Sequence, residues 1–166
     1  MASPAVTNFM TQQGFAPEAP DRAALRFRGL QFQPTIVGSV MLVAILTQSP
    51  AIFLLISAVL WLNALVPAAN PFENLYNRFI ARPRGRPLLT SAPEPRRFAQ
   101  GMAAIFMLAA GLSLLEGWRA AAYAFEGLLA VAFAALLFGK FCLGAYVYHL
   151  LKGNVAFANG TCPWSD

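Results

Sequence analysis

The chain has 166 residues, of which 58% are hydrophobic and only 11% are charged. A water-soluble domain carries about 25% charged residues, so this composition argues against a soluble protein. The formal net charge of +5 could suggest a nucleic-acid-binding protein. The basic residues border apolar segments, however, and we therefore interpret them as signals of membrane orientation.

We expect residues 1–33 to form an N-terminal cytoplasmic tail and a surface segment. The initial stretch MASPAVTNFMTQQGFAPEAP lacks the basic start and short apolar core of a secretory signal. It is therefore predicted to be a retained tail that is flexible or draped over a surface. The following segment, 21–33, mixes arginines with leucine and phenylalanine, which is typical of a chain that approaches a membrane surface.

The next apolar stretch predicts two membrane helices. No charged residue lies between Arg28 and Glu73, a window longer than the roughly 17–25 residues that one span needs. Pro34 suits the first turn of a helix, and the sequence TQSP at 47–50 predicts a tight turn. We expect a short first span from Pro34 to this turn and a second span over 51–67.

A short interfacial helix and a basic loop are predicted next. Asn70 and Pro71 form a helix-start signature, and the predicted helix covers 71–81. Its apolar residues recur at helical spacing: Phe72, Leu75, Tyr76, Phe79 and Ile80. Glu73 falls on the opposite, polar side, so we expect an amphipathic helix in the membrane interface. Prolines and arginines then predict an extended loop over 82–97.

Two further spans are predicted in the second half. The segment 98–115 is rich in alanine and glycine, which let helices approach closely in lipid. Trp118 and Arg119 follow as interface anchors. The last apolar run, 120–151, would measure about 48 Å as one helix. Because this length exceeds a hydrocarbon core of about 30 Å, we expect one end to project or bend. Residues 152–166 are predicted to be a C-terminal tail.

These elements predict an all-α integral membrane protein. Its membrane domain, 34–151, would contain four transmembrane helices as two hairpins, plus the interfacial helix. Every basic residue except Arg119 falls in segments that would share one face, provided that Lys140 reaches it. Because basic loops stay inside, we expect both termini on the cytoplasmic side of a bacterial inner membrane.

Glu126 is the one carboxylate within an apolar run. Carboxylates inside a membrane are costly, so they are usually paired, protonated or functional. Glu126 lies two helical turns after Arg119, near the predicted outer surface. We favour a structural role in which Glu126 reaches water or pairs with Arg119. The alternative is a role in proton or cation handling.

Two other side chains are candidates for chemistry. His149 could ligate haem or a chlorophyll-type pigment, although beside Lys152 we favour an interface residue. Cys142 lies in apolar surroundings, which favours an inert thiol. In a continuous helix, Lys140 would point away from this thiol. Cys162 could pair with it only if the C-terminal tail folds back. With one histidine and no recognised catalytic motif, we do not expect an enzyme.

Two motifs carry a resemblance to a known family. SAPEPRRFAQGMAAIF at 91–106 and GKFCLGAYVY at 139–148 resemble the bacterial membrane family catalogued as "domain of unknown function 4395". The resemblance covers roughly 25–151, and the matching positions are Arg97, Phe98, Ala99, Gln100, Cys142, Leu143, Gly144 and Tyr148. The family's pattern implies a second cysteine where this chain has Ala145. Paired-thiol redox or sulfur chemistry therefore does not transfer.

The leading functional expectation is a non-catalytic accessory or assembly subunit of a larger bacterial membrane complex, such as a respiratory or photosynthetic one. The abundance of small residues and the lack of catalytic groups motivate this expectation. The expected partners are membrane lipids and other membrane proteins, without nucleic acid. Two alternatives stay open: a thiol-redox or sulfur-handling protein that uses Cys142, and a small transporter that uses Glu126.

Overall fold

The computed structural model describes residues 4–162, and these residues form helices without any strand. The α-helices are α1 (Pro4–Gln12), α2 (Pro20–Leu30), α3 (Phe32–Thr47), α4 (Pro50–Leu65), α5 (Pro71–Tyr76), α6 (Glu94–Leu115), α7 (Arg119–Leu137), α8 (Leu143–Leu151) and α9 (Val155–Gly160). Shorter helical turns cover Pro67–Ala69, Asn77–Ala81 and Arg82–Arg84. The all-α prediction is therefore confirmed.

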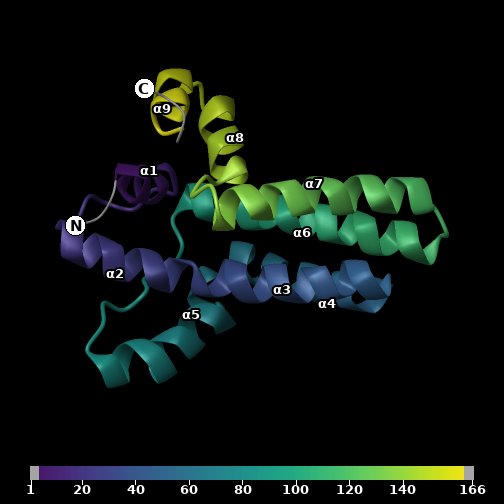
Figure 1. Ribbon diagram of the computed structural model, residues 1–166, viewed down its shortest axis with the longest axis horizontal. Coiled ribbons are helices and arrows are strands. Elements are labelled where there is room, and N and C mark those ends of the chain that lie inside the picture. Colours follow the sequence, from purple (N-terminus) through teal and green to yellow (C-terminus); the bar gives the residue numbers. More distant parts are fainter. Residues whose placement is uncertain (1–3, 163–166) are drawn as a thin grey trace.

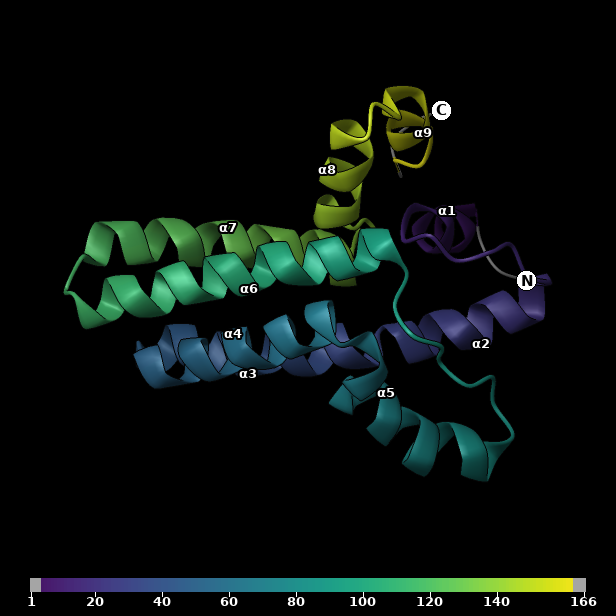
Figure 2. The ribbon, with the colours of Figure 1, turned by 180° about the vertical axis from the view of Figure 1, so that it is seen from behind.

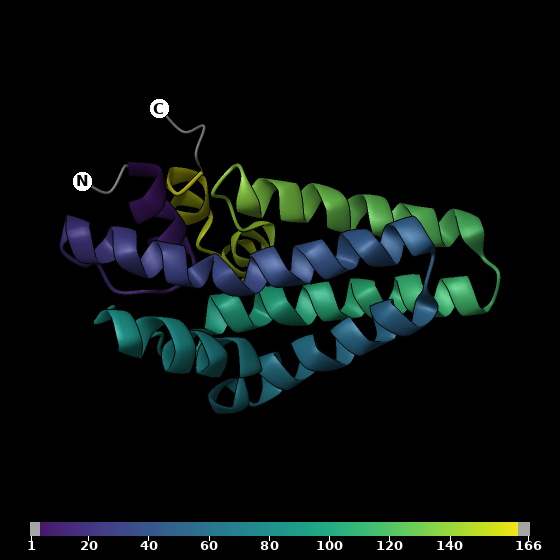
Figure 3. The ribbon, with the colours of Figure 1, turned by 60° about the horizontal axis from the view of Figure 1, so that its bottom comes forward.

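Four helices form an elongated bundle, and the others gather at one of its ends. Helices α3, α4, α6 and α7 lie side by side (Figures 1 and 3). The turns that join α3 to α4 and α6 to α7 lie at one end of the bundle (Figure 1). Helices α1, α2, α5, α8 and α9 lie at the other end (Figure 2). We call these two parts the bundle and the cap.

Local signals explain where several helices begin and end. In TQSP, Gln48 adopts a left-handed conformation with φ of 48°, and Pro50 opens α4. This confirms the predicted turn. The Asn70 side chain accepts hydrogen bonds from the backbone N–H groups of Phe72 and Glu73, at 3.0 and 3.4 Å. Asn70 therefore caps α5 as its residue type predicts.

The basic loop ends earlier than predicted. Helix α6 begins at Glu94 rather than at Phe98, so the last four residues of the predicted loop 82–97 are helical. The reason is that Pro95 falls in the first turn, where its missing N–H has no helical partner to lose. Arg82–Arg84 also forms a single 3₁₀ turn, which a proline in its first turn permits.

The helices are suited to a membrane. Three are long and apolar enough to cross one: the combined Pro20–Thr47, Glu94–Leu115 and Arg119–Leu137, while Pro50–Leu65 is apolar but shorter. Large apolar side chains on the bundle point outward, including Leu46, Leu55 and Val131, which are 76%, 67% and 67% exposed. A water-soluble protein would bury such side chains, so this surface indicates a membrane protein.

Small residues allow α4 and α6 to pack closely inside the bundle. A Cβ added at Gly111 of α6 would lie 3.0 Å from the Leu54 side chain and 3.2 Å from that of Phe53. Nearby, the Ser57 hydroxyl donates a hydrogen bond of 2.7 Å to the carbonyl oxygen of Ala104. Part of the small-residue content of α6 therefore serves internal packing rather than an external partner.

Both ends of the chain differ from the sequence expectation. The predicted flexible or draped tail contains α1, which buries Phe9 and Met10, because these side chains join an apolar cluster within the cap. Residues 1–3 of that tail lie outside the described residues. The predicted tail 152–166 contains α9, and its residues 163–166 are likewise outside them.

The last apolar run bends, as its length requires. Helix α7 ends at Leu137 and α8 begins at Leu143, and α8 crosses the end of the bundle steeply (Figures 1 and 2). Lys140 lies in this break with φ of 51°. Lys140 and Cys142 therefore do not share a continuous helix, so helical spacing does not set the direction of the Lys140 side chain. The Lys140 ammonium instead lies 5.9 Å from the ring centre of Phe27.

Two glycines within long apolar helices, Gly111 of α6 and Gly127 of α7, provide a matched test of this packing. Gly111→Leu should destabilise the protein by about 1–3 kcal/mol, because overpacking displaces Leu54 and Phe53. Gly127→Leu should cause no such loss, because a Cβ at Gly127 meets nothing within 4 Å. Thermal unfolding of both purified variants in detergent checks this difference, and equal unfolding temperatures would contradict the described α4–α6 contact.

Candidate functional site

The two motifs that carry the family resemblance meet where the bundle joins the cap. Gly144, in the first turn of α8, packs so closely on α6 that an added Cβ would lie 2.6 Å from both Cα and Cβ of Ala99. The rings of Phe98 and Tyr148 lie 5.6 Å apart. The Tyr148 hydroxyl donates a hydrogen bond of 2.7 Å to Glu94. Segments distant in the sequence therefore form one contact.

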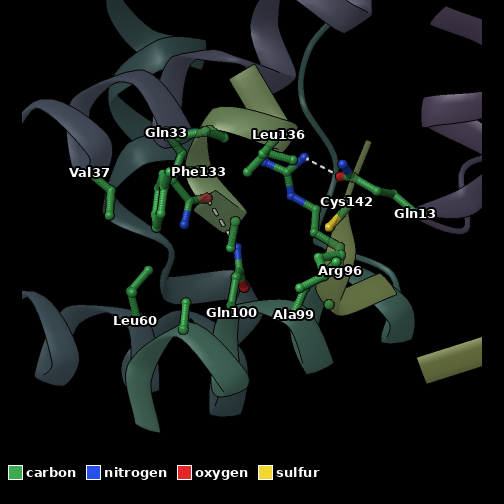
Figure 4. Close-up of a pocket in the computed structure, with 15 residues that line it drawn as sticks. Gln13, Gln33, Val37, Leu60, Arg96, Ala99, Gln100, Phe133, Leu136 and Cys142 are labelled. Carbon is green, nitrogen blue, oxygen red and sulfur yellow. Dashed lines mark hydrogen bonds between the residues drawn. The ribbon is translucent and has the colours of Figure 1, made fainter. Parts of the chain in front are cut away.

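A cavity of about 100 Å³ lies beside this contact (Figure 4). Its polar lining residues come from the cap, α3 and α6, and they are Gln13, Gln33, Arg96, Gln100 and Cys142. The rest of its lining is apolar and includes Pro34, Val37, Leu60, Ala99, Ala103, Ala132, Phe133, Leu136, Leu143 and Gly144. Five of the eight motif positions line this cavity, which makes it the candidate functional site.

Arg96 carries a buried charge at the polar side of the cavity. Its side chain is only 5% exposed, although the sequence suggested a topological signal in a loop. One terminal nitrogen donates to Gln13 Oε1 at 2.9 Å, and the other donates to the carbonyl oxygen of Leu30 at 3.3 Å. The guanidinium carbon lies 5.9 Å from the ring centre of Phe15. The segment after α1 and the end of α2 thus converge on one side chain.

Arg97, the neighbouring arginine, has a different role. Its Nε donates a hydrogen bond of 2.8 Å to the carbonyl oxygen of Ala64, near the end of α4. This carbonyl is among the last of its helix, where a cation satisfies acceptors that lack a helical donor. Arg97 therefore ties the start of α6 to the end of α4.

Three carboxamides form a chain across the junction. Gln33 Oε1 accepts hydrogen bonds from Gln100 Nε2 at 3.1 Å and from Asn70 Nδ2 at 3.4 Å. Gln33 and Gln100 point toward each other in Figure 4. Among the described residues, Gln100 Oε1 and Arg96 Nε have no hydrogen-bond partner. Of the cavity-lining residues that the structure describes, these are the one buried acceptor and the one buried donor without a partner.

Glu73 lies on the buried side of α5, not on its predicted exposed polar side. It is 6% exposed, whereas Leu75 and Phe79 are 52% and 64% exposed. Burial raises the pKa of the Glu73 carboxyl, while the positive charge of Arg96 and a hydrogen bond with Asn70 act in the opposite direction. The amphipathic helix therefore exists, but its acidic residue faces the interior of the cap, where other polar groups surround it.

Cys142 is a buried free thiol at the start of α8. Burial raises its pKa, whereas the backbone N–H groups of Ala145 and Gly144 and the charge of Arg96 act to lower it. Its own backbone N–H donates to Gln12 Oε1 at 2.9 Å. The thiol is thus protonated at neutral pH. The backbone N–H groups and Arg96 beside it could nevertheless stabilise a thiolate.

His149 is buried, at 8% exposure, and does not lie at an exposed interface beside Lys152. Its Nε2 lies 2.9 Å from the carbonyl oxygen of Gln12, and its ring centre lies 4.6 Å from that of Phe157. Because a carbonyl can only accept, we assign the proton to Nε2. A haem or pigment ligated through Nε2 would have to displace α1. No cluster of three or more metal-ligating side chains occurs among residues 4–162.

Glu126 lies at the opposite end of the bundle from the cavity. It is 5% exposed, and Gln48 Nε2 lies 3.1 and 3.2 Å from its two carboxylate oxygens. The residue therefore takes its hydrogen bond from the α3–α4 turn rather than from Arg119, which is exposed. This arrangement accords with a structural role, and transport through Glu126 stays a prediction.

Sequence reasoning missed the part that α1 plays in the site. Gln12 contacts both Cys142 and His149, and Gln13 contacts Arg96. The only signal in the sequence was a pair of consecutive glutamines next to apolar residues. Cys162, the other cysteine, lies after α9, and its thiol donates a hydrogen bond of 3.6 Å to the carbonyl oxygen of Ala158.

The burial of Glu73 should make stability depend on pH. A carboxyl group whose pKa is raised on folding binds its proton more tightly in the folded state, so its burial costs least in acid. Glu73→Gln should therefore unfold at a higher temperature than the native chain at neutral pH. The two unfolding temperatures should converge as the pH falls through the folded pKa. Comparing the two chains at each pH cancels the other titrating groups, and a constant difference would contradict this behaviour.

Comparisons with known proteins agree with the resemblance described above. The family model described as Domain of unknown function (DUF4395) matches residues 27–152. No curated protein and no solved structure is significantly similar to the chain. The matched range contains the bundle, α5, α8 and both motifs, and it begins after α1. The chain therefore belongs to the DUF4395 family, as its two motifs predicted.

Proposed function

We propose that this protein is a non-catalytic accessory or assembly subunit of a larger complex in a bacterial inner membrane. One observation carries the proposal, namely the outward face of α7. Small residues are exposed along it at the helical spacing i, i+4, i+7 and i+14: Ala120, Ala124, Gly127 and Ala134. A Cβ at Gly127 would meet nothing within 4 Å. We call these four residues the α7 outer face.

The α7 outer face differs from other lipid-facing surfaces of the bundle. Val131, at i+11 and 67% exposed, is a large side chain on this face, but the other positions of the stripe are small. The exposed side of α4 carries more large side chains, such as Leu55, Leu62 and Leu65, which suit contact with acyl chains. Small residues instead allow the backbone of another helix to come close, which is how helices associate in lipid. The α7 outer face therefore supports packing against a transmembrane helix of a partner protein.

The proposed arrangement in the membrane has four crossings, formed by two hairpins. Helix α4, with 16 residues, is about 24 Å long, and a span of that length requires the bilayer to thin locally. The exposed arginines Arg78, Arg82 and Arg84 belong to segments next to the cap, whereas Arg119 follows the α6–α7 turn. This distribution supports a cytoplasmic cap that contains both termini.

Site-specific photocrosslinking in membranes of the source organism tests the proposal. A photoreactive amino acid at position 127 should crosslink to one defined membrane protein, because the α7 outer face would be covered. The same probe at position 58, where Ala58 is exposed on α4, should label lipid only. Gly127→Leu should abolish co-migration with the partner on a native gel, and Ala58→Leu should preserve it. A native chain that runs as a lone monomer in mild detergent would contradict the proposal.

A second candidate function is thiol chemistry at Cys142, and the position of this thiol favours it. Cys142 immediately precedes α8, near Arg96 and next to Gln12 at the end of α1. Opening of α1 would remove the burial that keeps the thiol protonated and leave the groups that lower its pKa. The single cysteine would then act with a thiol or sulfur compound from outside the chain.

Loosening α1 should increase the reactivity of Cys142. The double variant Gln12→Ala and Gln13→Ala removes two hydrogen bonds worth about 1 kcal/mol each. In a chain with Cys162→Ser, maleimide should then modify Cys142 at least tenfold faster than in the same chain with native glutamines. Thr7→Ala, on the exposed side of α1, is the matched control and should leave the rate unchanged. Equal rates in all three chains would remove this candidate.

A further inference from the structure

The cavity between the bundle and the cap has an apolar side and a polar side. Val37 of α3, Leu60 of α4 and Phe133 of α7 line the apolar side. Arg96 and Gln100 belong to the polar side, and Figure 4 shows both groups of side chains around one space. A ligand that fits both sides is amphipathic, with a polar head and an apolar body.

The charge of Arg96 determines the nature of the head group. Within the described part of the chain, no carboxylate lies within 4 Å of this guanidinium, and Glu73 acts on it only from farther away. A buried charge is costly unless it is paired, and Arg96 Nε is a buried donor that has no partner among residues 4–162. The forked donors of a guanidinium match the two oxygens of a carboxylate.

Gln100 supplies a hydrogen-bond acceptor on the polar side of the cavity. Its Nε2 donates to Gln33, and its Oε1 is the other buried atom without a partner in the described cavity lining. A carboxyl group can serve these residues in its two protonation states: the carboxylate pairs with the charge of Arg96, and the O–H of the neutral acid can donate to Gln100 Oε1. A simple ester keeps the carbonyl acceptor but has neither the negative charge nor the O–H donor.

The volume limits how much of such a ligand the cavity encloses. On this measure one water needs about 10–15 Å³, so a cavity of about 100 Å³ accommodates a carboxyl group and a few methylene groups. A longer chain would have to extend out of the cavity. The acid could thus be a membrane fatty acid or a short carboxylic acid from water.

We infer that this cavity binds the carboxyl head group of an amphipathic monocarboxylic acid. Arg96 is the counterion of the ionised head group, Gln100 Oε1 accepts a hydrogen bond from the O–H of the neutral acid, and Val37, Leu60 and Phe133 contact the first methylene groups. The inference concerns the junction of the bundle and the cap. It does not depend on the α7 outer face or on a partner subunit.

Thermal unfolding of the full-length protein in lipid nanodiscs tests this inference with three probes: dodecanoate, butanoate and methyl dodecanoate. Dodecanoate should raise the unfolding temperature in a saturable manner, because a ligand that binds the folded state stabilises it. Methyl dodecanoate should not. If butanoate is equally effective, the acid comes from water; if only dodecanoate acts, it comes from the membrane. Either result supports the carboxyl site.

Variants separate binding in the cavity from general effects on the lipid. Arg96→Gln should abolish the response to dodecanoate. Because this variant can fail to fold, Ala132→Leu fills the cavity from α7 and leaves the polar groups in place. It should weaken the apparent affinity for dodecanoate at least tenfold. Ala130→Leu, at an exposed position of the same helix that is outside both the cavity and the α7 outer face, should respond like the native chain.

Three results would overturn the inference. The first is that neither acid shifts the unfolding temperature, in which case the cavity holds water only. The second is that methyl dodecanoate acts as strongly as dodecanoate, because the effect would then not involve a charge. The third is that Ala132→Leu retains the full native response, because the acid would then act outside the cavity.

Discussion

The burial of the Arg96 guanidinium is the interaction on which the junction between the bundle and the cap depends. Its hydrogen-bond acceptors are the side chain of Gln13 after α1 and the carbonyl of Leu30 at the end of α2. A buried charge must keep such partners, because the loss of one leaves a desolvated group unsatisfied. Arg96 therefore requires two segments of the cap to stay docked against the start of α6.

The bundle and its junction with the cap are held together by different kinds of contact. In the bundle, helices pack through apolar side chains, small residues and the hydrogen bond between Ser57 and Ala104. Most of the buried polar side chains gather at the junction, where carboxamides, a carboxylate, a thiol and an imidazole lie around or near Arg96. Glu126 is a buried carboxyl group at the far end, and it accepts a hydrogen bond from Gln48. The proposed partner surface and the proposed ligand site therefore lie on different parts of the molecule.

Local signals in the sequence predicted local features well. The turn before Pro50, the N-terminal capping of α5 by Asn70 and the apolar helices follow from residue type, spacing and composition. The interior of the cap could not be predicted in this way, because its contacts join segments far apart in the chain. Arg96 follows a proline-rich segment, so its pattern suggested an exposed loop, and Glu73 falls on the polar side of a helix that happens to face inward. Gln12 and Gln13 gave no pattern that predicts their distant partners.

The docking of α1 over Arg96, Cys142 and His149 can be measured directly by amide hydrogen exchange in lipid nanodiscs. If Arg96 holds this helix in place, the amides at the end of α1, up to Gln12, should be protected to a degree similar to those of α8. Their protection should fall in Arg96→Gln while that of α4 persists. Exchange of the α1 amides in the native chain at the rate of an unstructured peptide would contradict the described junction.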